Sequence, residues 1–289
     1  MHACGHDGHT TSLLGAGAML MRDTSWAGIV HLVFQPAEEG GGGALSMIRD
    51  GLFNRFPMES IYGYHNWPGL AAGTVMVHEG PVMAGGGRVE ITMEGLAGHA
   101  ALPHLTRDPM LAAGHVLVAL QSIVARNVDP LDTAVVTIGS IVGGQASNQI
   151  PSKVTMRGTQ RFYRDEVRDL LSESITRVAR GIAATFGMQA HVDVSVGIGP
   201  TVNHKANAGL AVEACGEAGI PVRTDLRPAM TGEDFSWYLH EKPGAFVWIG
   251  NGPSEPGRDL HNDGYDYNDA ILPNASGFLA GVAKRALRG

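Results

Sequence analysis

The chain has 289 residues, of which 44% are hydrophobic and 17% charged, and its formal net charge is −7. This composition is typical of a globular protein with one large α/β domain or two smaller ones. The acidic balance argues against a nucleic-acid partner, and no apolar run approaches the roughly 18 residues of a membrane span. Two cysteines and no leader-like N-terminus predict a cytoplasmic protein without a disulfide framework.

The N-terminal motif CGHDGH, residues 4–9, places a thiol, two imidazoles and a carboxylate within six residues. Thiolate and imidazole are ligands for Zn²⁺ and similar ions, and carboxylates can join them. The alternative is the start of a helix, with Asp7 near its N-terminus and Cys4 as a buried free cysteine. These six residues alone leave both interpretations open.

The first apolar run, GIVHLVF at residues 28–34, is rich in β-branched residues and too short for a helix, so it predicts a buried strand. Glu38 and Glu39 follow it, and ligands bind at the carboxyl ends of strands in open α/β sheets. Adjacent carboxylates point to different sides, so one could bind a metal ion while the other takes a proton from water. The alternative is an exposed acidic turn.

Residues 86–196 have the order β-α-β-β-α-β, which is the split pattern of a ferredoxin-like domain. Val89, Ile91 and Met93 alternate with polar residues in a first strand, and Asp108-Pro109 begins a helix through about residue 126. Strands at 133–141, 154–163 and 189–196 and a helix at 165–186 complete the pattern. We therefore predict an α/β fold in which residues 1–85 and 197–289 form one discontinuous catalytic domain and residues 86–196 an inserted ferredoxin-like α+β domain. A closing strand at 246–249 and a terminal helix at 273–287 are also expected.

Two further candidate ligands are His65 in YGYHNWP and His261 in LHNDGY. Either histidine alone would be weak evidence, and the other motifs of the chain make a metal-binding role more credible. The motif order MHACGHDGH, QPAEEGGGGA, GYHNWP, GLAGHAALPH, NQIPS, GEDFSWYL and LHNDGYDYND resembles the M20 metallopeptidase family. The likeness covers essentially the whole chain. It points to the aminoacylase-like branch, which contains hippurate hydrolases, auxin-conjugate hydrolases and N-acetyl-amino-acid deacetylases.

The resemblance implies a metallo-amidohydrolase that cleaves the linear amide of N-acyl amino acids, such as acetyl or benzoyl derivatives, with a metal-activated water. Two divalent ions, zinc or manganese, are implied as cofactors. Cys4 would bridge the two ions, His6 and His65 would complete one side, and Glu39 and His261 the other. Glu38 would be the catalytic base.

The inserted domain resembles the family's lid, through which a homodimer is expected. His99 looks like the histidine that stabilises the tetrahedral oxyanion, and Asn148 like a substrate-binding asparagine. Arg157 could pair with the carboxylate of the substrate in bidentate fashion, with an exposed strand face as the alternative. Glu233 and Asp234 resemble a family segment near the site that supports the ligands.

Two other functions stay open at this level: a hydrolase with Cys4 as nucleophile, and a non-catalytic metal-binding fragment or pseudo-enzyme. Members of the family carry a segment before the CGHD motif that forms early strands of the catalytic sheet, so the chain looks N-terminally truncated. The strand expected at residues 28–34 would then have an unpaired edge. Weak stability or obligate association is the resulting expectation.

Overall fold

The computed structural model describes residues 2–288, and the chain divides into two compact units. Unit 1 comprises Met1–Met83, Thr201–Ala229 and Glu233–Gly289, and unit 2 comprises Ala84–Pro200 with Met230–Gly232. The main divisions therefore fall at 83/84 and 200/201, close to the predicted boundaries at 85/86 and 196/197. Each unit has its own sheet and its own hydrophobic core.

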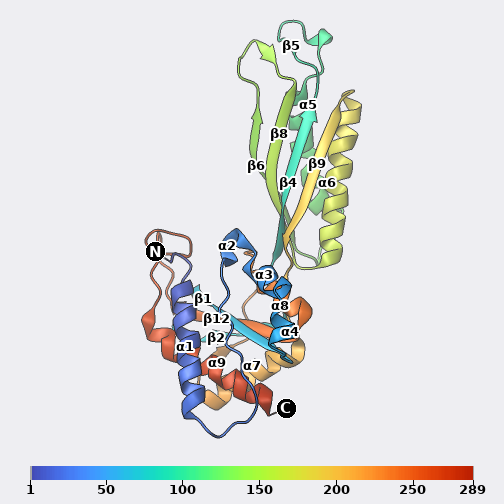
Figure 1. The fold of residues 1–289 in the computed structure, drawn as a ribbon. Helices are drawn as coiled ribbons and strands as arrows, with labels where there is room; N and C mark the ends of the chain where they lie inside the picture. Colours follow the sequence, from blue (N-terminus) through green and yellow to red (C-terminus); the bar gives the residue numbers. More distant parts are fainter. Residues whose placement is uncertain (1, 289) are drawn as a thin grey trace. The chain divides into compact units, whose positions relative to one another are not determined.

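Unit 1 is built on a four-stranded sheet of order β1-β12-β2-β11 (Figure 1). β1 (Ile61–Pro68) is parallel to β12 (Gly244–Gly252), β2 (Val75–Met76) is antiparallel to β12, and β11 (Val222–Arg223) is parallel to β2. β12 is buried along almost its whole length because helices cover both faces. Val247 and Ile249 face one core, while Phe246 and Trp248 face the other.

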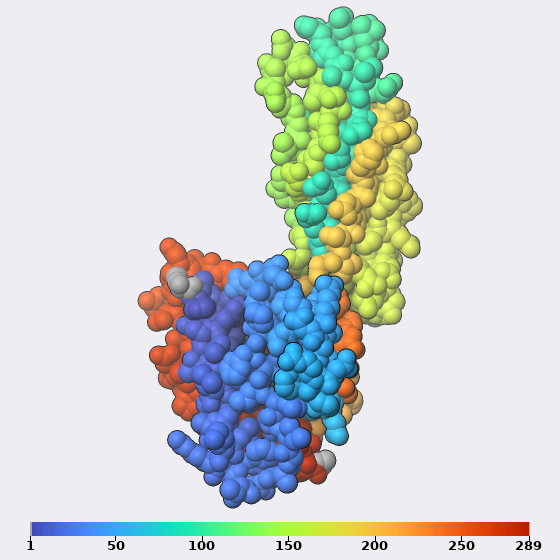
Figure 2. Space-filling view, viewed as in Figure 1, coloured from blue at the N-terminus to red at the C-terminus, as the bar shows by residue number. Residues whose placement is uncertain are grey.

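The helices of unit 1 form the two outer layers. α7 (Lys205–Ala218) and α9 (Leu272–Leu287) cover one face of the sheet, and α1 (His6–Arg22) packs on α9. The other face is covered by α3 (Gly43–Arg49), α4 (Leu52–Arg55) and α8 (Ser236–Glu241). α2 (Glu38–Gly41), the short β3–β10 pair (Gly80–Met83 with Thr201–Asn203) and η2 (Asp269–Ile271) complete the unit. The N-terminal elements from α1 to α4 cover the face of unit 1 that Figure 2 presents in blue.

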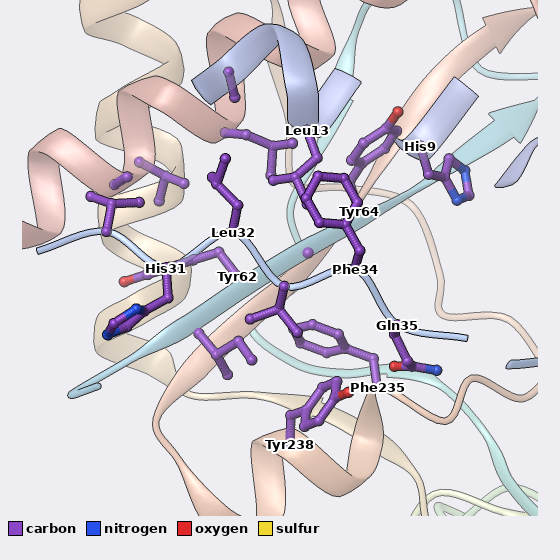
Figure 3. A pocket seen from close by; sticks show the side chains of 18 of the residues that line it. His9, Leu13, His31, Leu32, Phe34, Gln35, Tyr62, Tyr64, Phe235 and Tyr238 are labelled. Atoms are coloured by element: carbon purple, nitrogen blue, oxygen red, sulfur yellow. The ribbon is translucent and has the colours of Figure 1, made fainter. Parts of the chain in front are cut away.

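The prediction of a buried strand at residues 28–34 is wrong. The segment has no strand partner among the described residues, and Ile29 and Phe34 are 77% and 44% exposed. Its side chains and those of β1, which is the edge strand of the sheet, line the same cavity of about 1330 Å³ (Figure 3). β-branched residues favour a strand only where another strand supplies hydrogen bonds and packing, and here the nearest sheet edge lies across a cavity.

Unit 2 has the predicted β-α-β-β-α-β order, with a four-stranded antiparallel sheet of order β6-β8-β4-β9. Its strands are β4 (Gly85–Glu94), β6 (Ala134–Gly143), β8 (Lys153–Phe162) and β9 (Gln189–Ile198). α5 (Pro109–Arg126) and α6 (Asp165–Thr185) supply the other half of its core (Figure 1). Asp108 caps α5 by accepting hydrogen bonds from the main-chain N–H groups of Met110 and Leu111. The predicted α/β fold with an inserted ferredoxin-like domain is confirmed.

Helix α5 corrects the expectation that no apolar run approaches the length of a membrane span. α5 has 18 residues and is apolar enough, by length and composition, to cross a membrane. Its buried residues Ala112, Val116, Leu120 and Ile123 belong to the core of unit 2, where they pack with strand residues such as Ile91. Packing on the sheet therefore accounts for the apolar face of this helix.

Candidate metal centre

Cys4 lies at the centre of the cluster of predicted ligands in unit 1. The ligand atoms of Cys4, His6 and His65 all lie within 4.8 Å of one another, and so do those of Cys4, Glu39 and His261. The Cys4 Sγ atom is 3.3 Å from His65 Nε2 and 3.2 Å from His261 Nε2. The five predicted ligands thus form two groups that share one thiol, which is the division that the family resemblance implies.

Unusual backbone conformations place these side chains. Gly5, between Cys4 and His6, has a φ of 81° just before α1 begins. Ala37 (φ 51°) and His261 (φ 63°) are the non-glycine residues with positive φ among those that the structure describes. Left-handed conformations of non-glycine residues are uncommon and gather at functional sites. Here one residue precedes Glu38 and the other is itself a predicted ligand.

The histidines of the cluster are suited to bind a cation as neutral imidazoles. His65 is buried, and its Nδ1–H donates a hydrogen bond to the main-chain oxygen of Asn66 at 2.7 Å, which leaves Nε2 free to face Cys4. Burial lowers the pKa of His65 to about 4, and burial also lowers the pKa of His6. Both side chains therefore stay neutral near pH 7.

The thiol of Cys4 lies in surroundings that oppose its negative charge. Burial raises its pKa to about 12, and the nearby carboxyl groups of Glu39, Glu38 and Glu233 add to the shift. A thiolate needs a compensating cation here, because three acidic groups already surround it. The combination of thiol, imidazole and carboxylate suits borderline divalent ions, so the residues fit the two metal ions implied by the family.

The two adjacent glutamates have different surroundings. Glu39 lies between His6 Nδ1 and His261 Nε2, at 3.8 and 3.9 Å. Glu38 is 4.0 Å from His6 Nε2 and also groups with Glu233 and Asp234. Burial, followed by the charges of Asp234 and Glu39, raises the pKa of Glu38 to about 7. A carboxylate with this pKa is suited to accept and return a proton near neutral pH.

Glu233 and Asp234 lie directly behind Glu38. Asp234 accepts hydrogen bonds from Gln35 Nε2 at 2.7 Å and from the main-chain N–H of Ala44 at 3.2 Å. Glu233 is buried, accepts a hydrogen bond from the main-chain N–H of Phe235 at 3.1 Å, and has a pKa well above its ordinary value because of burial. Glu233 and Asp234 therefore lie where they can support the carboxyl group of Glu38.

The large cavity of unit 1 reaches this centre. His6, His9, Glu38 and Glu233 are among its polar lining residues. Figure 3 shows Leu32 and Phe34 from the unpaired segment, with Tyr62 and Tyr64 from β1, along its apolar part. A large concave site with convergent polar groups is the usual setting for binding and catalysis.

The predicted functional residues of unit 2 fall into two places. β5 (Gly98–His99) pairs with β7 (Gln149–Ile150), and the main-chain N–H of Ala100 donates to the oxygen of Asn148 at 3.0 Å, so His99 and Asn148 lie together. His99 is exposed, and its Nδ1 accepts a hydrogen bond from the N–H of Ala101 at 3.0 Å. The neutral ring therefore carries its proton on Nε2, where it can be donated to a ligand.

Arg157 is not part of this group. Its Nε donates to Glu90 Oε2 at 2.8 Å across the sheet, and its side chain is 53% exposed. The exposed strand face, which the sequence left as the alternative for Arg157, is the position that the structure shows.

Asn66 and Tyr265, which form a hydrogen-bonded group with His9, were not singled out from the sequence. His9 Nε2 lies 2.5 Å from Asn66 Oδ1, and Asn66 Nδ2 donates to the hydroxyl of Tyr265. The available signal was the position of Asn66 directly after His65 in the motif GYHNWP.

Comparison with known proteins gives a consistent result. The sequence profile described as "Peptidase family M20/M25/M40" matches residues 1–285. An N-acetyl-L-cysteine deacetylase of Bacillus subtilis is 41% identical over 288 residues, which are 99% of this chain and 68% of that protein. A hippurate hydrolase of Campylobacter jejuni is 38% identical over 290 residues, which cover 100% of this chain and 75% of that protein. A crystal structure from Bacillus subtilis, described as a dinuclear metal binding peptidase from the M20 family, superposes with a TM-score of 0.86. It is 34% identical, and the match covers 100% of this chain and 74% of that one.

Proposed function

This chain belongs to peptidase family M20/M25/M40, and we propose that it hydrolyses the amide bond of N-acyl amino acids at the centre around Cys4. It is a metal-dependent amidohydrolase. The observation that carries the proposal is the pair of ligand groups that share the Cys4 thiol, with the carboxyl group of Glu38 beside them.

The residues divide the chemistry between them. Divalent ions held by Cys4, His6, His65, Glu39 and His261 would supply the charge that polarises the amide carbonyl and lowers the pKa of water. Glu38 takes a proton from the attacking water and then gives a proton to the departing amine, for which its raised pKa is suited. For His99, whose Nε2 is left free to donate, we propose the stabilisation of the oxyanion of the tetrahedral intermediate. For Asn148 beside it we propose a role in substrate binding.

The identity of the ions and the oligomeric state are finer proposals. The donor set of one thiol, three imidazoles and one carboxylate supports zinc, with manganese as the other candidate. A homodimer through unit 2 is supported by β6, an edge strand on which Ile141 and Val142 are 42% and 59% exposed.

A cysteine-nucleophile mechanism fits the site less well. The thiol pKa of about 12 leaves almost no thiolate at neutral pH when no cation is bound. A non-catalytic metal-binding role would use the same ligands, so only turnover separates it from the proposed function.

The test is hydrolysis of a panel of N-acetyl, N-benzoyl and indole-acyl amino acids by the metal-loaded and the chelated protein. We expect amine release from at least one class with metal and background rates after chelation. Activity that survives chelation would favour the cysteine mechanism. Binding of two ions without hydrolysis of any member of the panel would favour a non-catalytic role.

A further inference from the structure

We propose that Asn66 is a positioning residue that holds three ligand-bearing segments of the metal centre in place before the ions bind. The inference rests on the metal centre of the proposed function but not on its substrate. Asn66 is fully buried on β1, directly after the predicted ligand His65. It is neither a ligand nor a catalytic residue in the mechanism above.

The hydrogen bonds of Asn66 reach three parts of the chain. Its side-chain Oδ1 accepts from His9 Nε2 at 2.5 Å, which ties β1 to the first turn of α1. Its side-chain Nδ2 donates to the hydroxyl of Tyr265, in the loop that carries His261. Its main-chain oxygen accepts from His65 Nδ1 at 2.7 Å and so fixes the orientation of that imidazole.

The amide group of Asn66 also supports the turn between Cys4 and His6. A Cβ atom added to Gly5 would lie 2.5 Å from Asn66 Oδ1 and 2.8 Å from the Tyr265 hydroxyl oxygen. The backbone of Gly5 therefore packs directly on the pair formed by Asn66 and Tyr265. Cys4 and His6 flank Gly5 in this turn. The position of the turn therefore determines where the Cys4 thiol and the His6 imidazole lie.

The chemistry of the amide explains why this residue suits the position. An asparagine side chain both accepts and donates, so it satisfies the imidazole of His9 and the hydroxyl of Tyr265 at once. An apolar side chain of similar size would remove both side-chain hydrogen bonds and leave His9 with only the main-chain N–H of Asn66, 3.2 Å from its Nε2. A buried polar group that loses its partner costs about 1–3 kcal/mol. The hydrogen bonds of Asn66 to His9 and Tyr265 form without a bound ion.

This network has a consequence for metal affinity. The segments that carry Cys4, His6, His65 and His261 converge on Asn66, and only the segment of Glu39 is held elsewhere. If these segments were free, metal binding would have to order them, which would weaken it. Removing groups that orient metal ligands typically lowers metal affinity about 10- to 100-fold, and we expect a loss of this size for Asn66→Ala.

Asn203 offers a matched control in the same unit. It is also buried, and its Nδ2 donates to the main-chain oxygens of His78 and Phe246, both at 2.9 Å. Its Oδ1 accepts from the main-chain N–H of Phe246 at 2.6 Å. None of these partners is a predicted metal ligand, so Asn203→Ala removes a comparable buried network without touching the centre.

The experiment measures zinc affinity by competition with a chromophoric chelator, together with thermal unfolding of the metal-free proteins. Both alanine variants should unfold at lower temperature than the wild type. Only Asn66→Ala should bind zinc about 10- to 100-fold more weakly. Zinc affinity of Asn66→Ala equal to the wild type would overturn the inference, and so would an equal loss in Asn203→Ala.

Tyr265→Phe provides a milder variant in case Asn66→Ala does not fold. It keeps the aromatic ring and removes the hydroxyl group, which contacts Asn66 and faces Gly5. Zinc binding should weaken several-fold, and unchanged affinity would again contradict the inference. Because no substrate is used, a wild type that binds zinc but hydrolyses no N-acyl amino acid would sink the proposed function and leave the role of Asn66 standing.

Discussion

The two units of the chain differ in how completely their sheets are packed. In unit 2 the four-stranded sheet has the order β6-β8-β4-β9, and α5 and α6 pack against it to close the core without a comparable cavity among the residues that form it. In unit 1 the sheet ends at β1, and the apolar segment 28–34 faces that strand across a cavity of about 1330 Å³. Interiors are normally close-packed with few voids larger than a water molecule, so unit 1 is the less tightly packed part.

The units also differ in where they place charge. Unit 2 keeps its ion pairs at the surface, such as Glu90 with Arg157. Unit 1 buries Glu233, Asp234 and His65 around one centre. Local rules of packing are broken most often at functional sites, so this contrast places the chemistry mainly in unit 1.

His99 is the largest exception to this assignment, since it is a residue of unit 2 with a proposed role in the reaction. His99→Ala should lower kcat/KM by about 10²- to 10³-fold, because it removes an oxyanion donor, and should leave metal content unchanged. His191→Ala is the control, because His191 is also exposed in unit 2 and contacts only Glu94 among the described ionisable groups. Steady-state kinetics with equal losses in the two variants would remove His99 from the mechanism.

The packing contrast itself can be tested with two truncations. Met156 is fully buried in the core of unit 2, whereas Leu32 is 38% exposed beside the cavity of unit 1. Met156→Ala should cost about 2–5 kcal/mol because it opens a cavity in a packed core. Leu32→Ala should cost less than about 1 kcal/mol. The free energy of unfolding of each variant can be measured by chemical denaturation, and hydrogen exchange reports it for each unit separately. Equal losses in the two variants would show that unit 1 is packed as well as unit 2.

Two carboxyl groups, one in each unit, should make the free energy of unfolding change with pH in opposite directions. The pKa of Glu38 rises from 4.5 to about 7, mainly through burial, so the folded state keeps a proton that the unfolded state releases. The metal-free protein should therefore lose stability as pH rises from about 4.5 to about 7. The hydrogen bond from Arg157 lowers the pKa of Glu90, so its small contribution is present above its ordinary pKa and is lost on acidification.

Thermal unfolding of metal-free protein across this range gives the measurement. Glu38→Gln should flatten the fall in stability between about pH 4.5 and pH 7, because glutamine has no proton to release. A slope identical to that of the wild type would mean that Glu38 titrates normally in the folded state.

Sequence patterns predicted unit 2 well because its elements follow local rules. The alternation of Val89, Ile91 and Met93 and the Asp108-Pro109 helix start correspond to β4 and α5 within a few residues. Residues 28–34 show the limit of such rules. Their β-branched composition is a real preference, but strand formation depends on a hydrogen-bonding partner that composition does not reveal.

For the site, motif order brought forward residues that the fold then places together, from Cys4 near the N-terminus to His261 near the C-terminus. The supporting residues were harder to find. Asn66 and Tyr265 are 199 positions apart in the sequence, and their contact depends on how β1 and the C-terminal loop meet. Arg157 was considered for substrate binding because of its charge. Its partner Glu90 lies opposite it on the neighbouring strand, and this pairing depends on the strand register, which the sequence alone does not reveal.

The most direct test of Glu38 as the catalytic base is turnover of an N-acyl amino acid by Glu38→Gln at the same metal content as the wild type. Glutamine keeps the shape of the side chain but cannot accept the proton, so turnover should fall by about 10²- to 10⁴-fold while two ions stay bound. Turnover within a few-fold of the wild type would contradict the role of Glu38 as base. Loss of metal from the variant would instead exchange the roles proposed for Glu38 and Glu39.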